Sequence, residues 1–352
     1  MSFAIGRGKS WENKMRRYIL RAGSGSLDDM VLEELDEPKP GPREVLIRVR
    51  ACSLNYRDQA VVTGNYFGGK VPADQVPLSD GAGEVVETGG EVSWFKPGDR
   101  VSSTFFLNWV EGSPPPMPRA ALGAPGATGM LSEYVVLPET AVVPMAANLS
   151  FEEAATLPCA GVTAWNGLTR GVAPLHPGQN VLLMGTGGVS ILALQLARAG
   201  GARTLITSSS DEKLQRAQAL GAQLGLNYKA EEGWGPAAAG RAGIEGFDKV
   251  IEVGGTGTLP QSMDAVGPDG EIALIGVLTR GDDTNPHRMM FKGASLRGIL
   301  VGSRRMHLDL NRAIEANGIH PVIDRIFPFD EAADAYRYQA TPSLFGKVVI
   351  SV

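Results

Sequence analysis

A glycine-rich segment, Gly185-Thr-Gly-Gly-Val-Ser190, has the residue types and the spacing to hold a phosphate group. A short apolar run, residues 181–184, precedes it, and apolar residues at helical spacing follow it. Such a turn directs backbone N–H groups and the positive end of a helix toward an anion. We predict that Gly185 makes the tight turn and that Gly187 lets a pyrophosphate approach the backbone. The other residues of the predicted dinucleotide site in this turn are Thr186, Gly188 and Val189.

The end of the predicted strand that follows the glycine turn, residues 204–207, distinguishes NAD sites from NADP sites. Sites for NAD usually carry an Asp or Glu there, which accepts a hydrogen bond from the ribose 2′-hydroxyl. This sequence has hydroxyl groups instead, on Ser208 and Ser209, and Lys213 and Arg216 follow within two helical turns. Hydroxyls and cations suit a 2′-phosphate, so we expect the cofactor to be NADP(H). We expect Ser210 to cap the helix that carries both cations.

The elements that must position these residues change in character along the chain. Up to about residue 145, apolar and polar residues alternate in stretches such as 44–50, which predicts short half-buried strands. After residue 150, short apolar runs are separated by helical stretches, as in a parallel sheet buried on both faces. These runs cover residues 181–184, 204–207, 249–253, 271–275 and 296–301. The predicted fold class is α/β, with a doubly wound parallel sheet that follows a β-rich domain.

Composition narrows the possible functions. The chain has 352 residues, enough for about two domains, and its net charge is −5 without a long basic run, so nucleic acid is not an expected partner. No apolar stretch is long enough for a membrane helix, and we expect residues 1–14 to be a frayed N-terminal extension. Two cysteines cannot form a disulfide framework, which favours a reducing, cytoplasmic location.

Several motifs in the same order resemble the medium-chain dehydrogenase/reductase superfamily, from about Met15 to Val352. Besides the glycine turn they are Gly81-Ala-Gly83, Lys96-Pro-Gly-Asp-Arg-Val101, Leu157-Pro-Cys-Ala-Gly-Val-Thr-Ala-Trp165 and Phe345-Gly-Lys347. The resemblance implies a GroES-like catalytic domain, residues 15–159, and a Rossmann dinucleotide-binding domain, residues 160–300. It also implies that a C-terminal segment, residues 301–352, returns to the catalytic domain.

The zinc enzymes of this superfamily hold a catalytic metal with a Cys, a His-Glu pair and a second Cys. In the motif alignment Asn55 stands in place of the first Cys, Ser79 and Asp80 replace the His-Glu pair, and only Cys159 is retained. A catalytic zinc ion needs three protein ligands, so we expect no zinc. The four histidines lie in other segments, and we expect each of them at the surface or in a turn: His176, His287, His307 and His320.

The resemblance is closest to the zinc-independent branch that includes quinone oxidoreductases, and it implies the remaining site residues. Asn55 and Tyr56 match residues that line the nicotinamide pocket, whereas the neighbouring Arg57 and Asp58 could form a structural ion pair. Further cofactor contacts are expected from Thr163, from Gly254, Gly276 and Val277 at two strand ends, and from Lys347 at the phosphates. Residues 302–304 could border the acceptor or form an ordinary loop.

These residues lead to one main hypothesis and two alternatives. The main hypothesis is hydride transfer from NADPH to a quinone or an α,β-unsaturated carbonyl, with Tyr56 as the donor to the developing oxyanion. The first alternative is an NADP-dependent alcohol dehydrogenase or carbonyl reductase without zinc. The second is a non-catalytic dinucleotide-binding redox sensor. A homodimer is one expectation, because the edge of a parallel sheet is an association surface.

Overall fold

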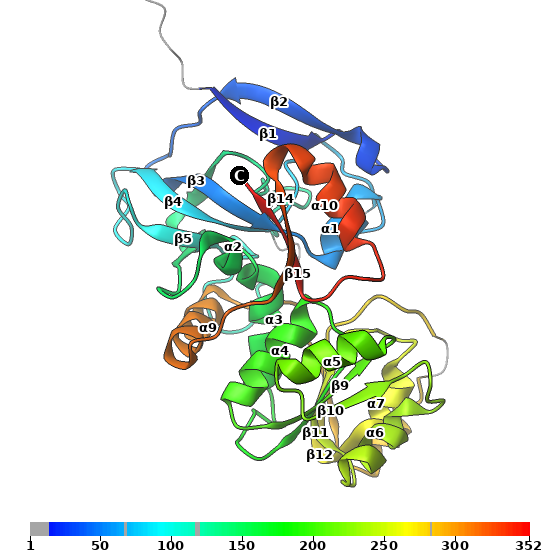
Figure 1. Cartoon of the computed structure of the whole chain (residues 1–352). Helices are drawn as coiled ribbons and strands as arrows, with labels where there is room; N and C mark the ends of the chain where they lie inside the picture. Colours follow the sequence, from blue (N-terminus) through cyan, green and yellow to red (C-terminus); the bar gives the residue numbers. More distant parts are fainter. Residues whose placement is uncertain (1–13, 67–68, 117–119, 282–283) are drawn as a thin grey trace, which may run out of the picture.

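The computed structural model describes residues 14–66, 69–116, 120–281 and 284–352. The expected N-terminal extension lies outside the described residues, except that Lys14 begins the first strand. Figure 1 shows two regions, one above the other, connected by helix α3 (Val162–Thr169) and by the C-terminal strands. None of the described helices is long and apolar enough to cross a membrane.

A mixed sheet forms the upper region. Among the described residues it has seven strands in the order β14-β15-β3-β4-β5-β7, and β6 pairs with β3 outside this path. The predicted strand at 44–50 is confirmed as part of β3. The bounds are β3 (Glu44–Ser53), β4 (Asp80–Thr88), β5 (Arg100–Ser103), β6 (Tyr134–Pro138), β7 (Val142–Pro144), β14 (Ile323–Pro328) and β15 (Lys347–Ser351), and a separate hairpin consists of β1 (Lys14–Leu20) and β2 (Met30–Asp36).

A parallel sheet of six strands forms the lower region and confirms the predicted fold class. Its order is β10-β9-β8-β11-β12-β13, so the sequence order reverses between β8 and β11, where doubly wound sheets bind their ligand. The strands are β8 (Asn180–Leu183), β9 (Arg203–Ser208), β10 (Leu224–Asn227), β11 (Phe247–Glu252), β12 (Val266–Leu274) and β13 (Ser295–Gly298). Helices α4 (Gly188–Ala199), α5 (Asp211–Ala219), α6 (Trp234–Ala242) and α7 (Leu259–Ala265) connect them.

Two predicted elements near the end of this sheet have different bounds in the structure. The apolar run 296–301 predicts a longer strand, but β13 ends at Gly298, and Val301 has a φ of 54°, which an extended strand does not allow. The sequence pattern after residue 302 predicts a helix over residues 309–316, but helix α9 (Arg304–Asn317) begins earlier, because Ser303 caps it by accepting a hydrogen bond from the N–H of Met306.

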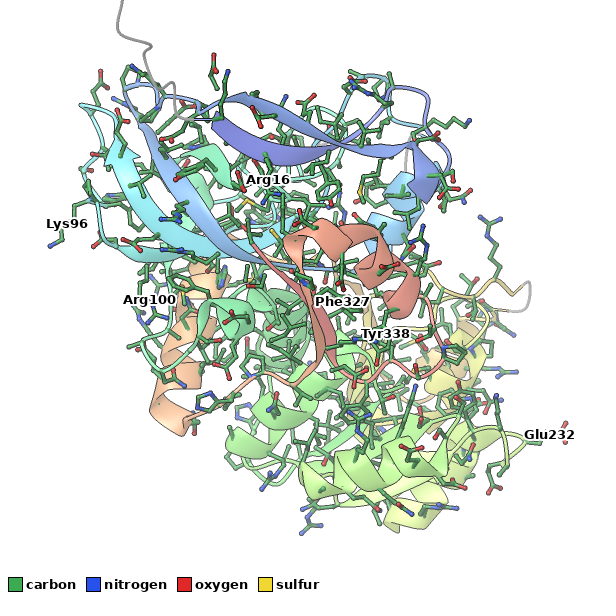
Figure 2. All side chains as sticks on the ribbon, turned by 45° about the horizontal axis from the view of Figure 1, so that its top comes forward. Arg16, Lys96, Arg100, Glu232, Phe327 and Tyr338 are labelled. Atoms are coloured by element: carbon green, nitrogen blue, oxygen red, sulfur yellow. The ribbon has the colours of Figure 1, made fainter. Side chains whose placement is uncertain are left out.

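The C-terminal segment returns to the upper sheet. Figure 1 shows β14, β15 and α10 (Ala332–Gln339), in red and orange, among the blue and cyan strands, and β15 pairs with both β14 and β3. Figure 2 places Phe327 beside Tyr338, with ring centroids 5.7 Å apart. The Tyr338 hydroxyl donates to Asp324, which also forms an ion pair with Arg216 of α5. The segment therefore joins both regions of the molecule.

Candidate functional site

The glycine turn between β8 and α4 leaves open space where a cofactor would lie. Gly185 has a φ of 71°, which favours glycine, and the Ser190 hydroxyl donates to the Met184 carbonyl at 2.5 Å and closes the turn. No atom of a neighbouring segment lies within 4 Å of the position that a Cβ would take at Gly185 or at Gly187. No side chain caps α4 at Gly187, and the N–H groups of the first helical turn have no acceptor within the helix itself. These residues fit a dinucleotide pyrophosphate.

The C-terminal segment packs directly against this turn. The N–H of Gly346 donates to the Thr186 carbonyl at 2.9 Å, and a Cβ at Gly188 would overlap the Lys347 side chain. Packing against Lys347 therefore suffices to explain a glycine at position 188. The Lys347 ammonium donates to Asn55 Oδ1 and to the Leu54 carbonyl, both at 2.6 Å. In this structure the ammonium is thus bound within the catalytic domain, and its contact with cofactor phosphates stays a prediction.

The residues expected to recognise a 2′-phosphate lie at the end of β9 and in α5. Ser208 is buried, and its hydroxyl accepts a hydrogen bond from the N–H of Ser210, the confirmed cap of α5. Lys213 donates to the carbonyl of Pro342, and Arg216 stacks on a phenyl ring of the C-terminal segment. Burial lowers the pKa of Lys213, and neighbouring Asp324 partly offsets that effect. The structure thus brings the cations to the C-terminal segment, while a role for them or for Ser209 in binding the cofactor stays a prediction.

Close packing accounts for the two glycines expected at the ends of β11 and β12. A Cβ at Gly254 would overlap Thr258, and a Cβ at Gly276 would overlap the backbone of Val253. The next residue, Val277, is 62% exposed. Sequence reasoning missed Glu252, a buried carboxylate that accepts hydrogen bonds from the N–H of Gly254 and from the residue after it. The sequence signal for Glu252 was the presence of a carboxylate inside the apolar run 249–253.

The catalytic-domain side of the site is built at the start of helix α1 (Tyr56–Val62). Asn55 caps the helix, and its own N–H donates to the Asp58 carboxylate at 2.7 Å. Tyr56 is 54% exposed, whereas Arg57 and Asp58 are buried. Arg57 Nη1 lies 3.3 Å from Asp58 Oδ1, which confirms the predicted ion pair. Asn55 and Tyr56 therefore face different surroundings, although they are neighbours in the sequence.

Two carboxylates and the Lys347 ammonium are buried close together. Asp80 accepts hydrogen bonds from the Ser79 hydroxyl at 2.6 Å and from the N–H of Cys159 at 3.0 Å. Burial raises the pKa of Asp58 to about 6 and also raises that of Asp80. Burial lowers the pKa of Lys347, and the Asp80 charge offsets part of that shift. Each carboxylate shares this region with a cation, which reduces the cost of burying it.

These residues do not fit a catalytic zinc ion. Within the described ranges, no group of three or more His, Cys, Asp and Glu side chains could hold a metal. The Oδ1 atom of Asn55 already accepts a hydrogen bond from Lys347. Burial raises the pKa of the Cys159 thiol, which disfavours the thiolate that would bind zinc. Cys159 lies instead in a single π-helical turn (Leu157–Gly161), a feature often found at functional sites.

One expected surface residue is buried, and one expected cofactor contact lies in a helix. The prediction for His307 is wrong, because this histidine of α9 is 1% exposed and neither ring nitrogen has a hydrogen-bond partner among the described residues. Helix α9, which carries it, packs against α3 and β7. Thr163 is buried in the first turn of α3, and its contact with the cofactor stays a prediction.

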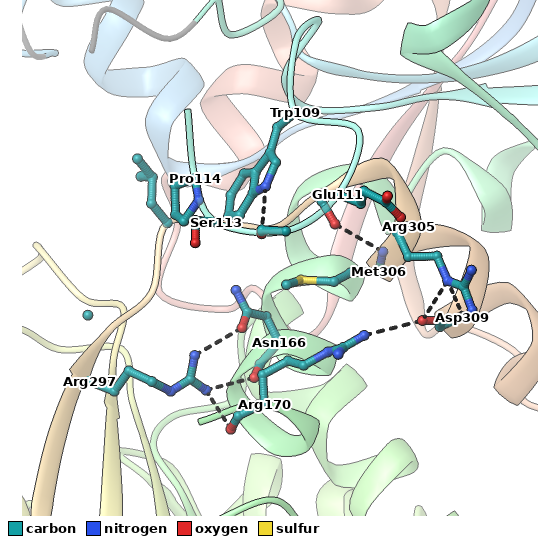
Figure 3. A pocket seen from close by; sticks show the side chains of 14 residues that line it. Trp109, Glu111, Ser113, Pro114, Asn166, Arg170, Arg297, Arg305, Met306 and Asp309 are labelled. Atoms are coloured by element: carbon teal, nitrogen blue, oxygen red, sulfur yellow. Dashed lines mark hydrogen bonds and ion pairs between the residues drawn. The ribbon is translucent and has the colours of Figure 1, made fainter. Parts of the chain in front are cut away.

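A cavity of about 730 Å³ lies elsewhere, between the loop 109–114, helices α3 and α9, and the edge strand β13 (Figure 3). Its cations are already engaged: Arg297 donates to Asn166, and Arg170 and Arg305 form ion pairs with Asp309. Ser303, in the segment 302–304 that could border the acceptor, lines this cavity, whereas Asn55, Tyr56 and the residues of the glycine turn do not. The candidate site is therefore the region between the glycine turn and Asn55.

Comparisons with known proteins agree with both regions of the fold. The family model described as "Alcohol dehydrogenase GroES-like domain" matches residues 41–147, and the model described as "Zinc-binding dehydrogenase" matches residues 188–316. A "Zinc-type alcohol dehydrogenase-like protein" of Schizosaccharomyces pombe is 44% identical over 347 residues, covering 96% of this chain and 99% of the relative.

Two further relatives differ in the activity that their names state. The "2-methylene-furan-3-one reductase" of Solanum lycopersicum is 32% identical and covers 93% of this chain and 76% of its own length. A solved structure of an NAD-dependent alcohol dehydrogenase is 32% identical, with a TM-score of 0.87, and covers 96% of this chain and 99% of its own. The chain belongs to the medium-chain dehydrogenase/reductase superfamily and is an NAD(P)-dependent oxidoreductase.

Proposed function

We propose that this protein is a zinc-independent, NADPH-dependent reductase of a quinone or an α,β-unsaturated carbonyl. The observation that carries the proposal is the contact of the Lys347 ammonium with Asn55 Oδ1 and the Leu54 carbonyl. A cation of the chain itself thus engages Asn55, which occupies the place of a metal ligand in the motif alignment. Cys159 supplies one soft ligand at most, and zinc at a catalytic site needs three.

A site without a metal restricts the acceptor. The bound dinucleotide supplies a hydride, and an isolated ketone that receives it develops a full alkoxide charge, which normally requires a Lewis acid or a well-placed donor. A quinone or an enone spreads the charge over a conjugated system, so hydrogen bonds from the chain can suffice. The exposed Tyr56 at the start of α1 is a candidate donor.

The relatives support a conjugated acceptor as one chemistry of this family. A 2-methylene-furan-3-one carries a C=C bond conjugated with a ketone, so the tomato relative is named for reduction of an enone. We expect the same bond type in the acceptor of this protein. The cofactor that we propose is NADPH, on the basis of Ser208, Ser209 and Lys213 at the end of β9 and in α5.

The decisive experiment is a screen of NADPH oxidation with quinones, enones, aldehydes, ketones and no acceptor, each with and without a chelator. We expect turnover with conjugated acceptors that the chelator does not change, and less than one zinc per chain by elemental analysis. Turnover that the chelator abolishes would contradict the proposal. A fluorescence titration should give tighter binding of NADPH than of NADH, and Lys213→Met should reduce that difference.

A second candidate function is an NADP-dependent alcohol dehydrogenase or carbonyl reductase that works without zinc. The names of the yeast relative and of the NAD-dependent structure favour it. In this case the oxidised cofactor would be reduced in the presence of an alcohol at alkaline pH. The same screen separates the two functions, because only the first predicts a preference for conjugated over isolated carbonyls.

We also propose that the protein works as a homodimer in the cytoplasm. Among the strands that the structure describes, the edge strand β13 pairs only with β12, and it carries the exposed Leu296, so it could accept a second copy. Cys52 and Cys159 are both free thiols, as the reducing cytoplasm requires. Light scattering measures the mass in solution, and a monomer at the working concentration would contradict the dimer.

A further inference from the structure

Asp324 of β14 lies beside the two cations that are expected to bind the 2′-phosphate of NADPH. Its Oδ1 atom is 2.9 Å from Nη2 of Arg216, and 8% of its side chain is exposed. Lys213 is close enough for the two charges to interact, because burial lowers the pKa of Lys213 and the Asp324 charge raises it again in part. The C-terminal segment thus brings a carboxylate to these cations, and no sequence pattern indicated it.

Asp324 is held in this position by two further hydrogen bonds. The Tyr338 hydroxyl donates to its Oδ2 atom at 2.9 Å, and the N–H of Phe345 donates to the same oxygen at 3.1 Å. Both donors belong to the C-terminal segment, as Asp324 itself does. The carboxylate is therefore fixed by its own segment, and its place does not depend on the Rossmann domain.

Arg216 has a second contact that does not depend on the carboxylate. Its guanidinium carbon lies 4.0 Å from the ring centre of Phe345, which is 1% exposed. Stacking of this kind orients a guanidinium and leaves the N–H groups at its edge free for hydrogen bonds. The Arg216 side chain is 42% exposed, so an anion from the solvent can reach it. Arg216 is thus both oriented and accessible.

Lys213 connects the same cations to the glycine turn. Its ammonium donates to the carbonyl of Pro342, and the N–H of Gly346 donates to the Thr186 carbonyl at 2.9 Å. The C-terminal stretch between these two contacts, residues 342–346, therefore joins the expected 2′-phosphate site to the expected pyrophosphate site. Residues of the catalytic domain can in this way influence which cofactor binds.

We propose that Asp324 is a specificity-determining residue, whose carboxylate competes with the 2′-phosphate of NADPH for Arg216 and Lys213. The inference rests on the proposed use of NADPH. Two cations and one carboxylate leave one net positive charge on these three side chains, whereas a phosphate monoester carries about −1.5 to −2. The Asp324 charge weakens the binding of that phosphate, and it has little effect on the neutral 2′-hydroxyl of NADH. The C-terminal segment thus limits the preference for NADPH.

Asp324→Asn tests the competition, because it removes the charge and keeps the shape of the side chain. The amide oxygen can still accept from Tyr338 and Phe345, and Arg216 keeps its stacking contact. We expect the Kd of NADPH to fall about three- to tenfold in a fluorescence titration, and the Kd of NADH to stay the same. Damage to the fold would weaken binding, so a gain of affinity identifies the charge effect. Unchanged or weaker NADPH binding would overturn the proposal.

Two further variants complete the series. Arg216→Gln should raise the Kd of NADPH about three- to tenfold and leave that of NADH unchanged, and an unchanged Kd of NADPH would also overturn the proposal. Asp334→Asn is the matched control, because Asp334 of α10 forms an ion pair with Arg337 at 2.8 Å in the same segment, with both side chains more than half exposed. It should bind like the wild type. An equal gain in this control would overturn the proposal, because it would show a general effect of lost negative charge.

Two nucleotides without a nicotinamide separate this inference from the proposed function. The probe 2′,5′-ADP carries the 2′-phosphate and 5′-ADP lacks it, and calorimetry measures the Kd of each. Asp324→Asn should bind 2′,5′-ADP more tightly and 5′-ADP like the wild type. If the wild type shows no preference for NADPH over NADH but the variant gains affinity for 2′,5′-ADP, the proposed cofactor is contradicted and the competition is supported. The absence of any gain overturns the competition whether or not the wild type prefers NADPH, and circular dichroism shows that the variants are folded.

Discussion

His307 makes the stability of this protein depend on pH in a way that can be calculated. The imidazole is 1% exposed in α9, and burial, with a smaller contribution from the Arg304 charge, lowers its pKa to about 3. In the unfolded chain the pKa of a histidine is about 6.5. Between these two values the unfolded chain binds more protons than the folded protein does. Stability is therefore complete above pH 6.5 and is lost progressively as the pH falls from 6.5 toward 3.

The loss of unfolding free energy at pH 5 follows from the pKa of the histidine in the unfolded chain. Protonation then stabilises the unfolded chain by about 1.4 kcal/mol for each of about 1.5 pH units, or about 2 kcal/mol. The folded pKa hardly enters this sum, because it lies far below 5. At pH 7.5 the contribution is close to zero. His307→Leu removes the titrating group and also the two unpartnered ring nitrogens.

Urea denaturation at pH 7.5 and at pH 5 measures the prediction. On going from pH 7.5 to pH 5, the wild-type protein should lose about 2 kcal/mol more of its unfolding free energy than His307→Leu does. His176→Gln, a change of an exposed histidine, should behave like the wild type. An equal loss in the wild type and in His307→Leu would refute the argument, because it would mean that His307 binds its proton equally in both states.

Three further predictions concern the cofactor turn, a buried ion pair and the exposed tyrosine. Gly187→Val should weaken NADPH binding at least about tenfold in a fluorescence titration with little change in Tm, because the new side chain meets open space in the protein but blocks the pyrophosphate; normal affinity would contradict the predicted site. Lys249→Met should lower the unfolding free energy by about 1–3 kcal/mol in urea, because it removes the ammonium 2.7 Å from the buried Glu271 and leaves that carboxylate with Arg297 at 3.2 Å; an unchanged unfolding free energy would show that the remaining partners satisfy Glu271. Tyr56→Phe should lower kcat without changing the Kd of NADPH, and an unchanged kcat would exclude Tyr56 as a donor.

The Rossmann half of the fold could be predicted because its signals are local. Strands buried on both faces give short apolar runs, and the glycine turn follows one of them directly. The strand β10 has the sequence Leu-Gly-Leu-Asn and lacks such a run, so it was missed. Helix α1 was also missed, because its first turn contains Arg57 and Asp58, whose burial depends on partners far away in the chain.

The contacts of the candidate site were harder to predict than its residues. Asn55 and Lys347 were both identified from motifs, but 292 residues separate them, and no sequence pattern indicated that their side chains bind each other. Arg57 was predicted correctly as an ion-pair partner of Asp58, but its hydrogen bond to the Leu122 carbonyl joins residues 65 positions apart. Such long-range contacts are visible only in the tertiary structure.

The charge balance around Asn55 supports the proposal that this site works without a metal. Two buried cations, Lys347 and Arg57, accompany two buried carboxylates, Asp58 and Asp80, so their formal charges cancel when all four are ionised. A divalent ion would add two uncompensated positive charges here. Hydride transfer, in contrast, leaves one positive charge on the oxidised dinucleotide and one negative charge on the acceptor oxygen, and this pair is neutral as a whole. In the proposed reaction the protein therefore needs no net counter-charge but only a donor beside the oxygen, and the exposed Tyr56 is the donor that we propose.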